Sequence, residues 1–248
     1  EFFGDAILCA LNDTKKYGLN QNPDFYILKD GDLKLFKEND TWLVNTVGSD
    51  CRYGSGKNYR VIGEKLYYIT TILHDAVLKS LDINGKEEIL TKLNGSVDTY
   101  VLSGDEIFFI GLRGLRLQEI YHLSGGEEKQ LTKFNEEIVK NKKLSYPEKF
   151  NIKNDGVEIE GWVLKPTDYE EGKNYPAILD IHGGPKTVYG EVFYHEMQVW
   201  ANMGYFVFFC NPRGGDGRGN EFADIRGKYG TIDYEDLMKF TDEVIKSY

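Results

Sequence analysis

Cysteine, long apolar runs and basic charge are all in short supply in this sequence. The three cysteines, Cys9, Cys51 and Cys210, are odd in number and far apart, so we expect reduced thiols rather than a disulfide framework. The best apolar run, residues 205–210, falls far short of the roughly 20 residues that a membrane-spanning helix needs. Acidic residues outnumber basic ones by 40 to 30, a net charge of −10, which argues against nucleic acid or an anionic membrane as the main partner. We therefore expect a cytoplasmic protein with neither of these partners.

The start of the sequence also lacks the features of a secretion signal. Glu1–Leu8 contains no initiator methionine, no basic segment and no small-residue cleavage site. At the other end, Tyr248 closes an expected amphipathic helix. We expect this chain to be the central piece of a longer protein, so a signal peptide before Glu1 stays an open alternative.

Residues 1–148 consist of short strand-like segments separated by polar turns, and part of this region repeats. Three correspondences share one offset of 41 residues: Tyr67 with Phe108, Gly85 with Gly126, and Leu90 with Leu131. A looser copy begins near Phe25. A period near 40 with several strands per unit is typical of a propeller blade, although two similar hairpins of another all-β domain would also align in this way. A ring needs at least four blades, so three units predict only part of a propeller.

From residue 149 onward the pattern changes to strand, loop and helix. Val157–Leu164 alternates apolar and polar residues like a half-exposed strand, whereas Ala177–Ile181 and Tyr205–Cys210 are dense runs typical of strands covered on both faces. Apolar residues at helical spacing over 193–201, followed by Gly204 as a C-terminal cap, predict a helix between the two dense strands. This alternation indicates an α/β layer with a largely parallel sheet.

A last helix is predicted after Gly230. Asp233 is the expected N-cap, because its carboxylate can accept hydrogen bonds from the free amides of the first turn. The predicted buried face consists of Leu237, Phe240, Val244 and Ile245.

Two glycine-containing loops follow the dense strands and are the candidates for chemistry. His182-Gly183-Gly184-Pro185 comes directly after the first strand, where glycines let backbone amides approach a ligand and stabilise a developing oxyanion. A simple turn has the same residue types. The second loop, residues 211–219, has neither the third glycine of a dinucleotide fingerprint nor the ending of a nucleoside-triphosphate loop, so phosphate binding is not favoured.

The two loops together, in this order, resemble the prolyl oligopeptidase family of serine peptidases, particularly its acylaminoacyl-peptidase-like and dipeptidyl-peptidase-like members. The matching residues run from Asp155-Gly156 and Gly161-Trp162 through both loops to Tyr229-Gly230 and Asp233-x-x-Asp236. The resemblance implies a partial all-β propeller over residues 1–148, followed by the N-terminal half of an α/β-hydrolase domain over residues 149–248. In this family the propeller precedes and caps the hydrolase domain, which is the order of the two regions here.

The resemblance also implies roles for individual residues. The loop of His182, Gly183, Gly184 and Pro185 would supply a backbone donor of the oxyanion hole, with Gly183 and Gly184 as the candidates and His182 as a structural residue. The scaffold positions around the active-site loops would be Asn211, Arg213, Gly214 and Asp233. Tyr229 stands where the family usually has tryptophan, and Gly215-Asp216 replaces the commoner Ser-Thr pair.

The serine nucleophile is missing from this chain. A hydrolase of this type needs a Gly-x-Ser-x-Gly elbow, then an acid, then a histidine, and no such elbow occurs here. The nearest string, Gly54-Ser55-Gly56, lies in the β region without a strand–turn–helix setting. We expect the whole triad beyond Tyr248, so this piece alone would be inactive. No histidine or cysteine pair has metal-ligand spacing, and no cofactor is expected.

The predicted function is that of part of a serine peptidase acting on short peptides through an acyl-enzyme. An esterase with a similar hydrolase core and a non-catalytic, propeller-containing interaction module are the alternatives. The expected partners are a peptide substrate and the remainder of the same chain. Half of an α/β sheet leaves an unpaired edge, so a dimer through that edge is a further expectation.

Overall fold

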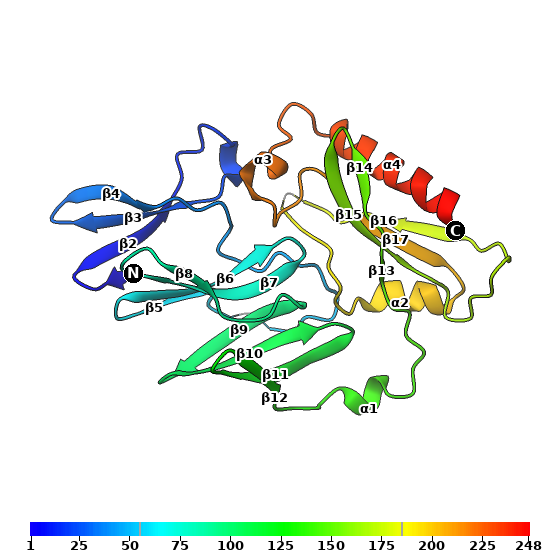
Figure 1. The fold of residues 1–248 in the computed structure, drawn as a ribbon, viewed down its shortest axis with the longest axis horizontal. Helices are drawn as coiled ribbons and strands as arrows, with labels where there is room; N and C mark the ends of the chain where they lie inside the picture. The colour runs from blue at the N-terminus through cyan, green and yellow to red at the C-terminus, as the bar shows by residue number, and fades with distance from the viewer. Residues whose placement is uncertain (55, 185) are drawn as a thin grey trace.

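The structure is a computed structural model that describes residues 1–54, 56–184 and 186–248. Three β-sheets follow one another along the chain, and most of the helices accompany the third (Figure 1). The first sheet has the order β1-β2-β3-β4, and all neighbouring strands in it are antiparallel. Its strands are β1 (Phe2–Phe3), β2 (Ala6–Leu11), β3 (Asp24–Lys29) and β4 (Asp32–Lys37). The short 3-10 helix η1 (Gly18–Asn20) lies in the loop between β2 and β3.

The second sheet consists of two four-stranded units, which the 41-residue repeat relates to each other. The first unit contains β5 (Tyr59–Ile62), β6 (Lys65–Ile72), β7 (Asp75–Asp82) and β8 (Glu87–Ile89). The second contains β9 (Ser96–Ser103), β10 (Glu106–Arg113), β11 (Arg116–Ser124) and β12 (Glu127–Gln130). Both are antiparallel meanders, and a single parallel pair, Ala76 with Ser96, joins them. The short helix α1 (Glu136–Val139) follows β12.

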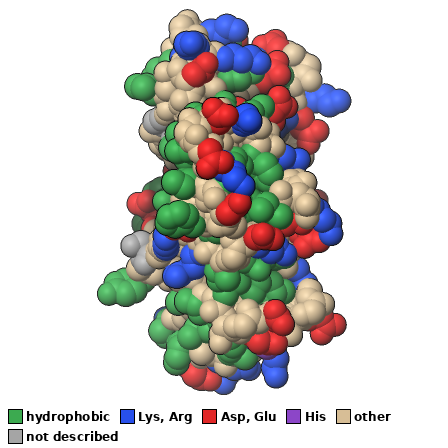
Figure 2. Space-filling view, turned by 90° about the vertical axis from the view of Figure 1, so that its left-hand side faces the viewer, with side chains coloured by type: hydrophobic (Ala, Val, Ile, Leu, Met, Phe, Trp, Pro, Cys, Tyr) green, Lys and Arg blue, Asp and Glu red, His purple; other side chains and the backbone are tan. Residues whose placement is uncertain are grey.

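Apolar side chains remain exposed on the end of the molecule that carries these sheets. Phe2, Leu33 and Leu35 of the first sheet are 78%, 50% and 51% exposed. Figure 2 shows hydrophobic patches among charged side chains of both signs on this end. A propeller blade buries its faces against neighbouring blades, so this exposure is consistent with part of a propeller.

The third sheet is mixed, which corrects the expectation of a largely parallel sheet. Its strands are β13 (Glu148–Lys149), β14 (Ile152–Asn154), β15 (Val157–Leu164), β16 (Ala177–Asp180) and β17 (Phe206–Asn211). The order is β13-β15-β17-β16, with β14 also paired to β15. Only β16 and β17 are parallel, because only they are joined by a helical crossover, whereas β15 runs antiparallel to every partner.

Helices cover both faces of this sheet. Their bounds are α2 (His195–Asn202), α3 (Gly219–Ala223) and α4 (Ile232–Ser247). In β17, Phe208 packs in the cluster of α4, and its neighbour Phe209 packs in the cluster of α2. Figure 1 shows the sheet between these two helices. The dense β17 run therefore has the predicted burial on both faces.

Three local expectations for this region are wrong. The N-cap of α4 is Thr231 and not Asp233, because the helix begins two residues earlier than predicted and Asp233 lies inside its first turn. Ile245 is 68% exposed, although Leu237, Phe240 and Val244 are buried as predicted. The other dense run is not covered on both faces, because none of residues 177–181 is buried and Ile181 is 54% exposed. Among the described strands, β16 has β17 as its single neighbour and so lies at the edge of the sheet.

Residues 1–130, which carry the first two sheets and are called the β-rich part below, contact the third sheet and its helices directly. Val47 pairs with Val188 in an isolated parallel bridge. The carboxylate of Asp50 accepts hydrogen bonds from the amides of His195 (2.7 Å) and Glu196 (2.8 Å), the first two residues of α2. A side chain of the β-rich part thus satisfies the free amides at the start of a helix in the other part.

Candidate functional site

The His-Gly-Gly loop leaves the end of β16 with its glycines facing open space. A Cβ atom built on Gly183 would meet nothing within 4 Å, and on Gly184 only the amide nitrogen of Lys186 at 3.7 Å. Neither glycine amide donates a hydrogen bond to another described residue. Pro185, the fourth predicted loop residue, lies outside the described residues. The two glycines therefore present backbone that a ligand could approach.

His182 is held as a strand-end residue. Its Nδ1 donates to the carbonyl of Gly183 (2.9 Å), and its ring packs edge-on against Tyr189. Burial lowers the pKa of His182, so the neutral imidazole is favoured. Its Nε2 is buried without a partner among the described residues. This environment favours a structural role over that of a catalytic base.

A cavity of about 450 Å³ lies beside this loop. It brings together six of the eight predicted site residues, because its lining includes His182, Gly183, Gly184, Arg213, Gly214 and Asp233. The segment Tyr17–Asn20 of the first sheet's long loop closes part of the wall. Both glycine-containing loops and the β-rich part thus meet at one hollow.

Asn211 does not line the cavity but fixes the chain behind it. The buried Asn211 amide accepts from the Tyr189 amide and donates to the Tyr189 carbonyl, both at 2.8 Å. This two-point clamp ties the end of β17 to the segment that follows the His-Gly-Gly loop. It agrees with a scaffold position.

Arg213 is held by the carboxylate of Asp236. Asp236 is part of the Asp-x-x-Asp motif but was not among the predicted site residues. Asp236 of α4 is fully buried and accepts from Arg213 Nε (2.9 Å), Arg213 Nη2 (2.7 Å) and the Arg213 amide (3.0 Å). This hydrogen-bonded pair raises the pKa of the Arg213 guanidinium. Asp155 adds a weaker contact at 3.2 Å from an exposed position. The Asp-x-x-Asp spacing could have indicated Asp236, because residues three apart on a helix lie on the same side and Asp233 was already a predicted site residue.

The predicted scaffold residue Asp233 lies one turn before Asp236 in α4, at the cavity wall. Its Oδ1 is buried with no hydrogen-bond partner among the described residues. Gly214 has a φ of +98°, and a Cβ there would lie 2.7 Å from Ile225. Only glycine fits this position without displacing the neighbouring segment.

The rest of the glycine-rich loop contacts the β-rich part, which the sequence did not reveal. Gly217 accepts a hydrogen bond from the Leu73 amide (2.7 Å), and a Cβ on Gly217 would lie 2.0 Å from the Leu73 carbonyl oxygen. A Cβ on Gly219 would lie 2.2 Å from the Asp40 carboxylate. These glycines allow close docking between the two parts of the chain.

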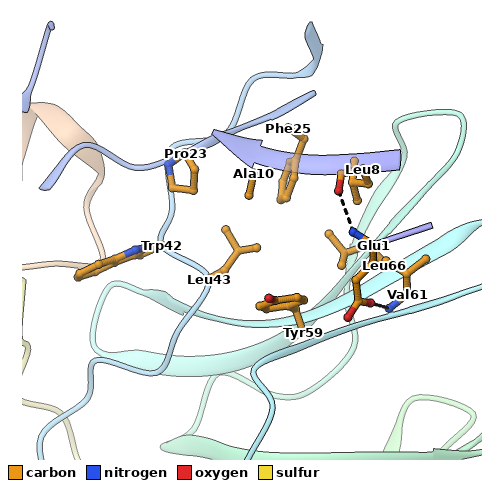
Figure 3. Close-up of a pocket in the computed structure, with 10 residues that line it drawn as sticks. All are labelled: Glu1, Leu8, Ala10, Pro23, Phe25, Trp42, Leu43, Tyr59, Val61 and Leu66. Carbon is orange, nitrogen blue, oxygen red and sulfur yellow. Dashed lines mark hydrogen bonds between the residues drawn. The ribbon is translucent and has the colours of Figure 1, made fainter. Parts of the chain in front are cut away.

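A second cavity, of about 420 Å³, lies between the first two sheets and away from both loops (Figure 3). Its lining is mainly apolar, including Leu8, Phe25 and Leu66. The charged residue Glu1 is already engaged, since its carboxylate accepts from the Val61 amide (2.8 Å) and pairs with Lys57. This cavity offers apolar surface rather than groups for catalysis.

Neither a serine elbow nor a metal cluster adds to the site. Ser55 of the nearest serine string lies outside the described residues. Among the described residues, no three His, Cys, Asp or Glu side chains gather closely enough to hold a metal ion. In the same part of the chain, no helix is both long and apolar enough to cross a membrane.

Comparisons with known proteins identify the relatives of this chain. The model of the prolyl oligopeptidase family matches residues 191–248. The uncharacterized peptidase YuxL of Bacillus subtilis is 43% identical over 155 residues, which cover 60% of this chain and 24% of that protein. A probable dipeptidyl-peptidase 5 of Arthroderma benhamiae is 31% identical over 65% of this chain and 23% of its own length.

The structural comparison extends the likeness to nearly the whole chain. The acylaminoacyl peptidase of Pyrococcus horikoshii superposes with a TM-score of 0.81 at 28% identity, covering 98% of this chain and 37% of that one. These relatives and neighbours are peptidases, and the resemblance predicted from the motifs is confirmed. The chain is therefore similar to members of the prolyl oligopeptidase family, whose model matches its C-terminal part. It spans about a quarter of the length of the curated relatives that it matches.

Proposed function

We propose that this chain is part of a serine peptidase that hydrolyses short peptides, and that the loop of His182, Gly183, Gly184 and Pro185 supplies a backbone donor of its oxyanion hole. The observation that carries the proposal is the pair of glycines at the cavity, with amides that bond to no other described residue. Donors held in place at the end of a strand stabilise negative charge without reorganising during the reaction. The peptidase names of the relatives agree with this reaction class.

In the proposed reaction, a serine that follows residue 248 in the same polypeptide attacks the peptide carbonyl carbon, and negative charge moves to the carbonyl oxygen. The amide of Gly183 or Gly184 would donate a hydrogen bond to that oxygen. A histidine, which also follows residue 248, takes the serine proton and passes it to the leaving amine as the C–N bond breaks. Water then hydrolyses the acyl-enzyme ester. Within this chain, Asn211 and Arg213 hold the two loops, and Ser, Asp and His of the triad would follow Tyr248.

We further propose that residues 1–148 are the last blades of a propeller and that residues 149–248 form the N-terminal half of an α/β-hydrolase domain. The helical crossover between β16 and β17 and the helices on both sheet faces support the second assignment. The three free cysteines of the described structure support a reducing, cytoplasmic location.

The outer edge of β16 has no neighbouring strand among the described residues, so its backbone groups can pair with another strand. We propose that a further strand of the same polypeptide pairs with it. In a protein that ended at this point, a second copy would cover the edge instead. Light scattering separates the two cases: the full-length protein should be free of edge-mediated dimers, whereas residues 1–248 alone should dimerise.

The proposed function is tested on the full-length protein that contains this chain. We expect a fluorophosphonate probe to label one serine, and peptidyl or acylaminoacyl anilides to be cleaved faster than simple acyl esters. Preference for acyl esters would favour an esterase. A protein that neither reacts with the probe nor cleaves any of these substrates would overturn the proposal.

Two variants of one glycine test the oxyanion donors. Gly183→Pro removes the amide hydrogen, and we expect kcat to fall by roughly 10²–10³-fold, as for loss of one oxyanion donor. Gly183→Ala keeps the amide, and its Cβ would meet no protein atom within 4 Å, so kcat should fall far less than in the proline variant. Equal activity of the proline and alanine variants would contradict a donor at residue 183.

A further inference from the structure

Lys186, just beyond the His-Gly-Gly loop, is a lysine in an unusual place. Its side chain is fully buried, and its backbone adopts φ +61° in the left-handed region that non-glycine residues rarely occupy. Lysine is almost never fully buried unless it is paired. Such a strained conformation persists only where the surrounding contacts enforce it.

The contacts of the ammonium group come from three separate segments. Nζ donates to the Asn20 carbonyl (3.0 Å) and to the side-chain oxygen of Asn22, and it lies 3.7 Å from Asp216 Oδ1. It also lies 4.8 Å from the ring centre of Trp42, within range of a cation–π interaction. Asn20, Asn22 and Trp42 belong to the β-rich part, and Asp216 belongs to the loop after β17.

The partners of Lys186 are themselves fixed. Asn22 is buried, and its amide donates to the side-chain oxygen of Asn220 (2.7 Å). Asp216 is buried and accepts from the hydroxyl of Thr46 at 3.0 Å. One ammonium group therefore joins the C-terminal end of the His-Gly-Gly loop to a rigid set of groups, most of them from the β-rich part.

We propose that Lys186 is a positioning residue through which the β-rich part sets the orientation of the Gly183 and Gly184 amides toward the reacting carbonyl. The proposal rests on the function proposed above. Only one residue separates Gly184 from Lys186 in the chain, so a change in the anchor shifts the donors directly. Burial lowers the pKa of the Lys186 ammonium while Asp216 and Asp40 oppose this shift, so the charge that makes the anchor depends on those carboxylates.

The test uses Lys186→Met in the full-length protein, which keeps the length of the side chain and removes its donors. Steady-state kinetics with a chromogenic peptide substrate, normalised to serines titrated by a fluorophosphonate, should show kcat reduced by roughly 10–100-fold with KM little changed, as for a small misplacement of a catalytic group. Lys142→Met removes a lysine from an exposed position and should leave both constants unchanged.

A second variant keeps the inference testable if Lys186→Met folds poorly. Asn22→Ala removes one acceptor from a segment more than 150 residues away in sequence, and we expect the same loss in kcat to a smaller degree. A purely structural lysine would lower the melting temperature of both variants but leave kcat per titrated serine unchanged, and that result would overturn the inference. Failure of the unmodified protein to react with the probe would instead refute the proposed function.

Discussion

The ion pair between Asp236 and Arg213 gives the sharpest stability prediction. The perturbation is Asp236→Asn in the full-length protein, which preserves the shape of the side chain but removes its charge. Asp236 is fully buried and accepts three hydrogen bonds from Arg213 and one from Asn154. Loss of one partner of such a pair leaves the other charge uncompensated, which costs about 3–5 kcal/mol.

The assay is thermal unfolding of Asp236→Asn beside Asp155→Asn. At about 2–4 °C per kcal/mol for a domain of 150–250 residues, the Asp236 variant should melt roughly 6–20 °C lower. Asp155 makes one contact with the same guanidinium from a side chain that is 63% exposed, so its variant should change stability by less than about 1 kcal/mol. Equal, small shifts for both variants would refute the view that Asp236 anchors the loop.

Two further predictions concern the contacts between the β-rich part and the third sheet. Gly217→Ala should lower the free energy of unfolding by about 1–3 kcal/mol more than Gly227→Ala, because both glycines have positive φ but only the Cβ at 217 would collide with backbone; comparative melting curves check this, and equal losses would argue against close docking at Gly217. His74 and Glu160 predict a pH dependence. Burial acts to lower the pKa of His74, but the hydrogen bond to Glu160 and the negative charges of Asp75 and Glu160 together outweigh it, so the pKa is raised, while His74 lowers the pKa of Glu160. A raised histidine pKa contributes stability that is complete below its ordinary value of 6.5 and is lost as pH rises through the folded value, and Glu160 stays ionised throughout that window. The melting temperature should therefore fall as the pH rises above 6.5, and His74→Gln should flatten that fall; an unchanged slope would exclude this pair as its source.

The sequence predicted those strands and helix ends that are determined by the spacing and turn residues of the segment itself. The 41-residue repeat corresponds to two four-stranded units, and β6 and β10 begin at Lys65 and Glu106, again 41 residues apart. The helix before Gly204 ends as its residues indicate, with Gly204 at φ +91°. Spacing and turn residues carry this information because strands and helices bury side chains at fixed periods.

Features that depend on distant segments escaped prediction. A dense apolar run predicts burial but not which neighbour provides it, so the one-sided edge position of β16 could not be read from Ala177–Ile181. A lysine predicts a solvated side chain, and the burial of Lys186 depends on Asn20 and Asn22 from another part of the chain. The roles of Gly217 and Gly219 likewise depend on segments that the sequence alone does not bring near them.

The hydrogen bonds that Asp50 accepts from the start of α2 have a consequence for folding during synthesis on the ribosome. The acceptor precedes the amide of His195 by 145 residues, so it leaves the ribosome well before the helix that needs it. Domains generally fold as units, the N-terminal one first. The β-rich part can therefore be in place, with its carboxylate presented, when the eight residues of α2 emerge. A circular permutation that moved residues 1–148 behind residue 248 would reverse this order. The first amides of α2 would then lack their acceptor until Asp50 had been synthesised.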